Sequence, residues 1–293
     1  MKKIEELEPI TNHPFKRVVV LLSNLEKINQ LLQKAVDFSQ QHQTSLEILY
    51  VQEEALFEIP DYFLSESEIT HERLDKKRIK AKIQEHLLAL GVQEKYAILI
   101  YENDTVNQLL YTFKEQKETL FITAYHQELN EKLIEKTPYS FWIIKKSVPQ
   151  YKMIALPLDF SENGKKALQI TQHLFSKNAI TIVHDYRYLL DAVEIQVDYL
   201  NLIPILSPDT IAFNERLKEK QKEKFENYKK EFRVKGECIE GKGALDQDLM
   251  NYISKRGFDL TILYHQDSEL FLSPSLILTL LKEVSTDFFI FNL

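Results

Sequence analysis

The stretch Met153–Leu168, which reads MIALPLDFSENGKKAL, indicates most directly how this 293-residue chain folds. It begins with a short, nearly continuous apolar run, as is typical of a strand buried on both faces. Asp159 and several polar residues follow, and the spacing of Ala167, Ile170 and Leu174 then places apolar side chains on one face of a helix. A buried strand that leads through a polar turn into an amphipathic helix is the building unit of parallel α/β sheets.

The other half of the chain repeats this plan. Arg17–Leu22 (RVVVLL) parallels Lys152–Leu158 (KMIALPL), and the triplet Tyr-His-Gln at 125–127 recurs at 264–266, an offset of 139 residues (265 minus 126). Each half contains five apolar runs separated by helical patterns. The predicted strands are 18–22, 46–51, 96–101, 120–125 and 141–144 in the first half, and 153–158, 180–183, 238–240, 260–264 and 288–291 in the second.

The repeat predicts an α/β protein with two tandem, doubly wound, parallel five-stranded sheets, each in the strand order 3-2-1-4-5. The predicted domains are residues 1–148 and 149–293. Bare aromatic last strands would promote association, so we expect the halves to pair through them as an internal pseudo-dimer, with a further homodimer left open. Ser207-Pro208 predicts the start of a long helix. The apolar face of that helix contains Phe213, Leu217, Phe225, Tyr228 and Phe232, and its Lys- and Glu-rich remainder is interpreted as a solvated surface.

Composition and charge argue against several classes of protein. Glycine occurs only 6 times, where average usage of about 7% would give roughly twenty, so glycine-rich phosphate loops are scarce. The 44 acidic residues outnumber the 37 basic ones, which provides no overall positive field for DNA, RNA or an anionic membrane. The single cysteine, Cys238, permits no internal disulfide, and no stretch is typical of a signal peptide or a membrane span. We therefore predict a cytoplasmic protein without nucleic-acid or membrane partners.

The second half resembles a domain of the universal stress protein family. The resemblance rests on MIALPLDFSENGKKAL and on the second strand, ITIVHD, which ends in His184 and Asp185. With both halves included, the chain after residue 15 resembles a tandem universal stress protein. The resemblance implies the adenine nucleotide alpha hydrolase-like fold and a role in stress response. In nucleotide-binding members, it further implies a loop of the form Gly-x-x-Gly, nine residues, Gly-Ser/Thr after strand four.

The same resemblance supplies the candidate ligand-binding residues. Asp159 matches the aspartate that contacts the adenosine, Asp185 stands where a backbone group contacts the base, and Ser275 matches the loop hydroxyl. The full set of candidates is Asp159, Ser161, Asp185, Gly243, His265 and Ser275. The glycines of the loop are absent: Tyr264-His265-Gln266 stands where the loop should begin, and Pro274, which has no N–H, precedes Ser275. We therefore expect a degenerate nucleotide site and no cofactor, with ATP as the alternative.

The first half departs further from the family. Ser23-Asn24 replaces the aspartate, and Asp104 takes the place of Gly243. The interval from His126 to Phe141 is 15 residues, against 23 from His265 to Phe288, so eight residues of loop and helix are expected to be absent. We predict that the first domain is structural and that the second faces the ligand.

Two other interpretations concern the second half. Asp159, His184 and His265 fall at strand ends, where a carboxylate with imidazoles could bind a divalent metal or serve acid/base chemistry. The favoured alternative is a hydrogen-bonded structural network. The aliphatic segment 192–208 (AVEIQVDYLNLIPILSP) would be either a lid or interaction patch, or a buried part of the domain. No catalytic motif is present.

The sequence thus favours a cytoplasmic universal stress protein-like protein that acts in stress response by binding a small ligand or a protein partner, without catalysis. The alternative is an ATP-binding protein that slowly hydrolyses ATP at its second domain.

Overall fold

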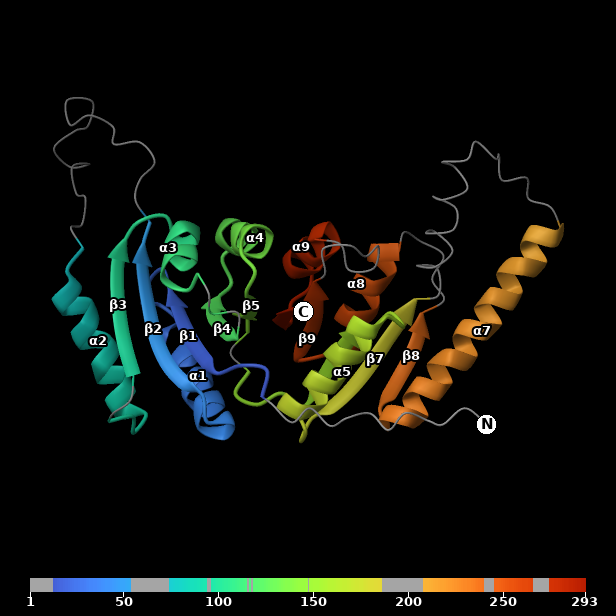
Figure 1. The fold of residues 1–293 in the computed structure, drawn as a ribbon, viewed down its shortest axis with the longest axis horizontal. Helices are drawn as coiled ribbons and strands as arrows, with labels where there is room; N and C mark the ends of the chain where they lie inside the picture. Colours follow the sequence, from blue (N-terminus) through green and yellow to red (C-terminus); the bar gives the residue numbers. More distant parts are fainter. Residues whose placement is uncertain are drawn as a thin grey trace, which may run out of the picture. The chain divides into compact units, whose positions relative to one another are not determined.

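The computed structural model describes residues 13–53, 74–93, 96–114, 116, 118–146, 148–185, 208–239, 245–265 and 274–293 (Figure 1). Contacts divide the chain into two compact units. The N-terminal unit spans Asn12–Ile144, and the C-terminal unit consists mainly of Lys145–Leu293. The division falls a few residues before the predicted boundary at 148/149. No helix among these residues combines the length and the apolar character that crossing a membrane requires.

The N-terminal unit is a five-stranded parallel sheet in the order β3-β2-β1-β4-β5. Its strands are β1 (Arg17–Leu22), β2 (Ser45–Gln52), β3 (Tyr96–Glu102), β4 (Thr119–Ala124) and β5 (Ser140–Ile144). Its helices are α1 (Ile28–His42), α2 (Lys76–Ala89), α3 (Thr105–Thr112) and α4 (Gln127–Lys136).

The C-terminal unit repeats this topology with the order β8-β7-β6-β9-β10, again all parallel. Its strands are β6 (Met153–Pro157), β7 (Ala179–Asp185), β8 (Lys235–Ile239), β9 (Leu260–His265) and β10 (Asp287–Asn292). Its described helices are α5 (Glu162–Leu174), α7 (Pro208–Phe232), α8 (Leu245–Arg256) and α9 (Pro274–Glu283). The predicted α/β class and the order 3-2-1-4-5 are confirmed in both units. The pairing of the halves as a pseudo-dimer stays a prediction.

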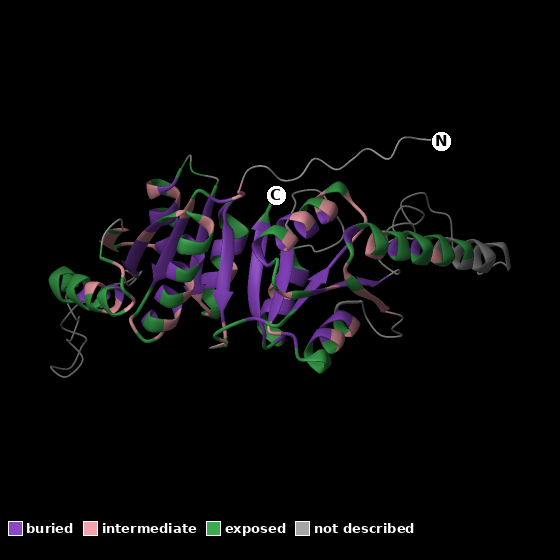
Figure 2. Cartoon of the chain, turned by 90° about the horizontal axis from the view of Figure 1, so that it is seen from below, coloured by how far each residue is buried: buried purple, intermediate pink, exposed green. Residues whose placement is uncertain are grey.

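The inner strands are largely apolar because helices cover both faces of each sheet. In β1, residues 18–22 are almost completely inaccessible, and Figure 2 shows the strands as the buried layer. The helices bury one stripe each: α1 buries Ile28, Leu31, Leu32 and Val36, at the spacing expected of one helical face. The long helix α7 begins at Pro208 as predicted, and its described surface is largely exposed (Figure 2).

One prediction about the fold is wrong. The first half was expected to lack part of the helix after its fourth strand, but α4 and α9 are both 10 residues long. The eight-residue difference lies entirely between the strand and the helix. In the N-terminal unit, α4 begins directly at Gln127 because His126 caps it: His126 Nδ1 accepts from the N–H of Leu129 (3.5 Å), and Asn130 Oδ1 accepts from the N–H of His126 (2.6 Å). The corresponding residues of the C-terminal unit, 266–273, lie outside the described part of the chain.

Candidate functional site

The predicted site residues lie at the ends of three neighbouring strands of the C-terminal unit. Asp159 follows β6, His184 and Asp185 end β7, and His265 ends β9. Since β6 lies between β7 and β9, and since parallel strands present their carboxyl ends at one edge of the sheet, these residues share the edge at which doubly wound folds bind ligands. The side chain of His265 lies outside the described part of the structure.

Three hydrogen bonds hold the Asp159 carboxylate. Its Oδ1 accepts from the backbone N–H of Ser161 (3.1 Å), from Ser161 Oγ (2.5 Å) and from the hydroxyl of Tyr264 (2.7 Å). The Tyr264 oxygen in turn accepts from the backbone N–H of Asp159 (3.1 Å). Hydrogen bonds to an ionised carboxylate are roughly twice as strong as neutral ones. The turn after β6 is therefore fixed to the end of β9.

The turn also caps helix α5. Ser161 is its N-cap residue, and Ser161 Oγ accepts from the backbone N–H of Gly164 (3.0 Å) while donating to Asp159. This N–H is one of those that a helix would otherwise offer to an anion. Gly164 is required here because a Cβ atom would lie 2.5 Å from Asp159 Oδ1, 2.8 Å from the Asp159 carbonyl oxygen and 2.9 Å from the Tyr264 hydroxyl.

Tyr264 occupies the space beside Asp159. It is 3% exposed, and its hydroxyl lies among Asp159, Ser161 and the start of α5. The sequence already indicated that this tyrosine stands where a glycine loop would begin in nucleotide-binding relatives. The structure adds that its hydroxyl donates to the Asp159 carboxylate.

His184 is buried and engaged at both ring nitrogens. It is 2% exposed; Nδ1 lies 2.8 Å from the carbonyl oxygen of Leu158, and Nε2 lies 3.1 Å from Gln221 Oε1. A ring nitrogen that meets a protein group in this way is not directed at a metal. Both contacts fit the hydrogen-bonded network that the sequence favoured. The choice against a metal site of Asp159, His184 and His265 stays a prediction, because the side chain of His265 lies outside the described part of the structure.

An aromatic cluster surrounds His184. The ring of Phe160 lies 4.3 Å from that of His184 and 5.3 Å from that of Tyr228, centroid to centroid, and Phe225 stacks on His184 at 6.1 Å. Lys224 Nζ lies 4.9 Å from the centroid of Phe160, at cation–π distance. Side chains of α7 thus cover the edge of the sheet at the end of β7.

The hydroxyl of Tyr228 is strongly perturbed. Burial raises its pKa to about 12, and the negative charges of Glu162, Glu231 and Asp159 act in the same direction. Both causes disfavour a phenolate, so Tyr228 contributes a neutral ring and hydroxyl to the cluster.

Gln221 was not predicted from the sequence. It is 4% exposed and lies on the buried stripe of α7 at helical spacing with Phe225, Tyr228 and Phe232. A glutamine within an otherwise apolar stripe is a signal for a buried polar partner, and that partner is His184.

The remaining candidates do not join this network in the same way. Asp185 is 1% exposed, on the opposite face of β7 from its neighbour His184, whereas Ser275 is exposed on the first turn of α9. Gly243 and the aliphatic segment 192–208 lie outside the residues whose side chains are described.

In the N-terminal unit, the matching positions serve as local structural groups. Asn24 Oδ1 accepts from the N–H of Glu26 (3.0 Å), and Asp104 caps α3 by accepting from the N–H of Asn107 (2.8 Å). Together with the cap that His126 provides, these contacts give the polar groups of the N-terminal unit roles within its own turns.

A second carboxylate network, also missed from the sequence, anchors the segment after β5. Asp287 is completely buried; its Oδ1 accepts from the backbone N–H groups of Lys145 (2.8 Å) and Lys146 (2.7 Å), and its Oδ2 accepts from the Tyr151 hydroxyl (2.6 Å). Lys145 Nζ donates to the carbonyl oxygens at the end of α9, Leu281 (2.6 Å) among them. Burial lowers the pKa of Lys145, and the neighbouring charge of Lys146 acts in the same direction, against the carboxylate of Glu283.

The sequence and the structure were compared with those of known proteins. No protein-family model and no curated protein matches the sequence. Among solved structures, a universal stress protein from Archaeoglobus fulgidus matches with a TM-score of 0.59 at 10% identity, covering 95% of this chain and 97% of its own. A protein described as a universal stress protein from Pseudomonas aeruginosa matches with a TM-score of 0.59 at 13% identity, covering 94% and 93%. A protein of unknown function from Pseudomonas aeruginosa PAO1 matches with a TM-score of 0.58 at 13% identity, covering 94% and 92%.

At these identities the likeness concerns the fold, and it extends over nearly the whole chain. The protein therefore has the fold of the universal stress proteins.

Proposed function

We propose that this is a cytoplasmic, universal stress protein-like protein that acts in stress response by binding a small ligand or a protein partner, without catalysis. The fold supports the stress-response assignment, because two of the solved structures that it matches are described as universal stress proteins. The absence of catalysis and of a cofactor is our inference from the side chains at the carboxyl edge of the C-terminal sheet.

The observation that carries the proposal is the hydrogen bond from Tyr264 to Asp159 (2.7 Å). A nucleotide bound in the manner of the family would need this carboxylate and the N-terminal end of α5. Both are engaged within the protein, because Asp159 Oδ1 accepts three hydrogen bonds and Ser161 Oγ takes the N–H of Gly164. Displacing Tyr264 would leave its buried ring and hydroxyl to be accommodated elsewhere.

The sequence after β9 supports the same proposal. Residues 264–275 include no glycine, although the backbone of a phosphate loop must approach its ligand at positions that side chains obstruct. The second candidate is an ATP-binding and slowly ATP-hydrolysing protein. It is favoured by three residues that match the family's nucleotide site: Asp159 after β6, Ser161 close to it, and the exposed Ser275 at the start of α9.

Titration calorimetry of the full chain with ATP and magnesium separates the two candidates. We expect no saturable heat and no release of phosphate above a buffer blank. Asp104→Ala is the matched control for Asp159→Ala, because both substitutions remove an aspartate from the turn before a helix, but in different units. Saturable ATP binding that Asp159→Ala abolishes and Asp104→Ala preserves would establish the ATP-dependent alternative.

The ligand or partner is sought separately. Mass spectrometry of small molecules that remain with the protein through gentle purification tests for a ligand, and chemical cross-linking in cell extract tests for a protein partner. We expect one of them to yield a stoichiometric component. A preparation with neither, from stressed and unstressed cells alike, would contradict the proposal.

A further inference from the structure

A hollow of about 340 Å³ lies in the C-terminal unit, where α5 and α7 end and where β7 and β8 begin. It is therefore at the amino ends of the strands, opposite the edge that carries Asp159. Its lining includes Ser176, from the turn after α5, and Arg233 and Lys235, from the junction of α7 and β8. All three side chains are exposed, so a dissolved molecule can reach them.

The two cations of this hollow are not paired within the described part of the protein. Neither Arg233 nor Lys235 makes an ion pair or a side-chain hydrogen bond with a residue that the structure describes. Cations that follow a helix often bond its last carbonyl oxygens, but here a neutral group does so, because Gln172 Nε2 donates to the carbonyl oxygen of Phe232 (2.7 Å). The guanidinium and the ammonium thus keep their donors for another partner.

The backbone of Arg233 adopts a conformation that suits glycine better than arginine. Its φ is 53°, in the left-handed region, and the N–H of Val234 returns to the carbonyl oxygen of Lys229 (3.2 Å), as in a Schellman helix end. After α2, the N-terminal unit has glycine in the left-handed conformation, Gly91 (φ 76°). Strained residues of this kind cluster at binding sites, so the position of Arg233 indicates a use for its side chain.

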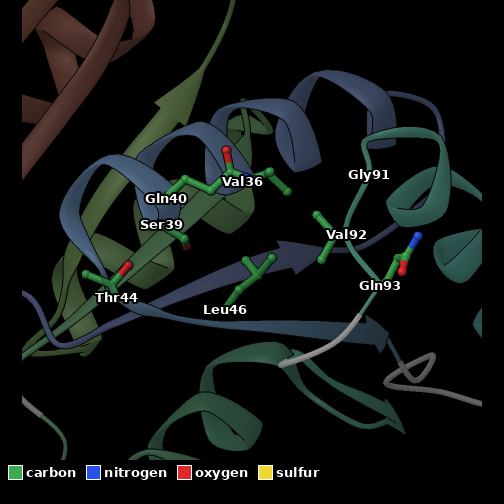
Figure 3. Close-up of a pocket in the computed structure, with 8 residues that line it drawn as sticks. All are labelled: Val36, Ser39, Gln40, Thr44, Leu46, Gly91, Val92 and Gln93. Carbon is green, nitrogen blue, oxygen red and sulfur yellow. The ribbon is translucent and has the colours of Figure 1, made fainter.

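The N-terminal unit provides an internal comparison. A hollow of about 260 Å³ lies there at the start of the second strand, β2, as the larger hollow lies at the start of β7 (Figure 3). Counted from the left-handed residue after the helix, Gly91 and Gln93 line the first hollow where Arg233 and Lys235 line the second. The fold therefore closes this turn without a cation at either position.

Positive charge prevails around the larger hollow. Each carboxyl end of a helix carries about half a negative charge, so the ends of α5 and α7 offset about one of the two positive charges of Arg233 and Lys235. The other charged residues in 175–178 and 230–235 are Lys177, Lys230 and Glu231, all exposed, and they add one further positive charge (two minus one). This surface favours an anion.

We propose that this hollow binds the phosphate group of a small molecule. The planar guanidinium of Arg233 matches two phosphate oxygens with parallel N–H donors, Lys235 supplies a second positive charge, and Ser176 supplies a hydroxyl donor. The volume is at the lower end of the range of small-molecule sites, about 300–1,000 Å³, and leaves room for a small organic group. The site is separate from the carboxyl edge, so its failure would leave the proposal for that edge unaffected.

The test is an NMR titration of the full-length ¹⁵N-labelled protein with glycerol 3-phosphate, inorganic phosphate and glycerol. We expect saturable shifts at the backbone amides of Ser176, Val234 and Lys235 with both phosphates, weakening as the salt concentration rises, and none with glycerol. The ester should bind several-fold more tightly than inorganic phosphate, because its organic part also lies in the hollow. Equal affinities would support the phosphate site and identify its ligand as inorganic phosphate.

Three variants assign the binding to the hollow. Arg233→Gly should weaken binding at least about tenfold, because a bidentate charged contact is lost. Glycine also relieves the left-handed backbone, so the urea-unfolding midpoint of this variant should equal or exceed that of the wild type, which excludes misfolding. Lys235→Gln should weaken binding several-fold. The matched control, Lys230→Gln, removes an exposed lysine that lies in the last turn of α7 but does not line the hollow, and affinity should be unchanged.

A fourth variant separates charge from shape. Arg233→Lys keeps the charge but loses the planar donors, so its affinity should lie between those of the wild type and Arg233→Gly. Shifts that stay linear to the highest concentration, that glycerol reproduces, or that Arg233→Gly leaves at wild-type affinity would overturn the proposal. Phosphate binding that Asp159→Ala abolishes and Arg233→Gly preserves would also overturn it, because the ligand would then lie at the carboxyl edge.

Discussion

Replacing Tyr264 with phenylalanine removes one oxygen atom from the carboxyl edge of the C-terminal unit. The substitution tests whether the Tyr264 hydroxyl fixes the turn after β6 to the end of β9. The substitution preserves the ring, which is 3% exposed, so the packing around it should change little. It deletes the donor to Asp159 Oδ1 (2.7 Å) and the acceptor of the Asp159 backbone N–H (3.1 Å).

The expected cost follows from these two bonds. A hydrogen bond to a charged acceptor contributes about 1.5–3 kcal/mol, and a neutral one contributes about 1 kcal/mol. Their sum is about 2.5–4 kcal/mol, but Asp159 is partly exposed and water can replace some of the loss. We therefore expect Tyr264→Phe to lower the free energy of unfolding by about 2 kcal/mol.

Urea unfolding of the full chain measures this effect as a shift of the midpoint at constant slope. Tyr139→Phe is the matched control, because the Tyr139 hydroxyl donates at 2.8 Å to a neutral acceptor, the carbonyl oxygen of Phe113, in the other unit. It should cost about 1 kcal/mol. In a double-mutant cycle, Tyr264→Phe and Asp159→Asn should show a coupling of about 1.5 kcal/mol or more. A cost for Tyr264→Phe below about 0.5 kcal/mol, or no coupling, would show that the hydrogen bond between Tyr264 and Asp159 does not stabilise this edge.

Three further substitutions test the C-terminal unit by urea unfolding. Gly164→Ala should destabilise it by about 1–3 kcal/mol despite the better helix propensity, because its Cβ would lie 2.8 Å from the carbonyl oxygen of Asp159; greater stability would contradict this. Asp287→Ala should cost about 2–3 kcal/mol, since the buried Tyr151 hydroxyl and two partly buried backbone N–H groups lose their acceptor at about 1 kcal/mol each, and a cost below about 1 kcal/mol would argue against the anchoring role. The pKa of Tyr228 is raised from 10.0 to about 12, so the free energy of unfolding should hold below pH 10 and fall as the pH rises from about 10 to about 12. Tyr228→Phe should reduce that fall. The same pH profile in the variant and the wild type would disprove this role of Tyr228.

The fold could be predicted because burial dictates the pattern of each strand. Parallel strands covered on both faces must be apolar at every position, and runs such as 18–22 and 260–264 meet that requirement without ambiguity. The strand β8 was the weakest prediction, placed at 238–240 although it spans Lys235–Ile239. It is an edge strand with only intermediate or full exposure, so its sequence carries little of the apolar signal.

The candidate site could be predicted only in part. Asp159 and Ser161 were identified through the resemblance of Met153–Leu168 to the universal stress protein family, which covers one short stretch of sequence. The partners that define their surroundings are distant: Tyr264 is 105 residues from Asp159, and Gln221 is 37 residues from His184. Asp287 likewise binds backbone groups about 140 residues away and occupies the first position of a strand where a polar residue carries no special pattern. Long-range pairing of this kind is set by tertiary packing, which periodicity in one chain does not encode.

The way the helices begin connects these observations to function. A helix N-terminus binds an anion through N–H groups that the helix itself leaves unpaired. In this protein Asp75, Asp104, His126 and Ser161 cap α2, α3, α4 and α5 with their own side chains. The fold thus keeps the helix ends that usually receive phosphate, while side chains satisfy N–H groups at these four. We therefore expect the proposed binding function, at the carboxyl edges of the sheets, to use uncharged groups or a protein surface rather than the capped ends of these helices.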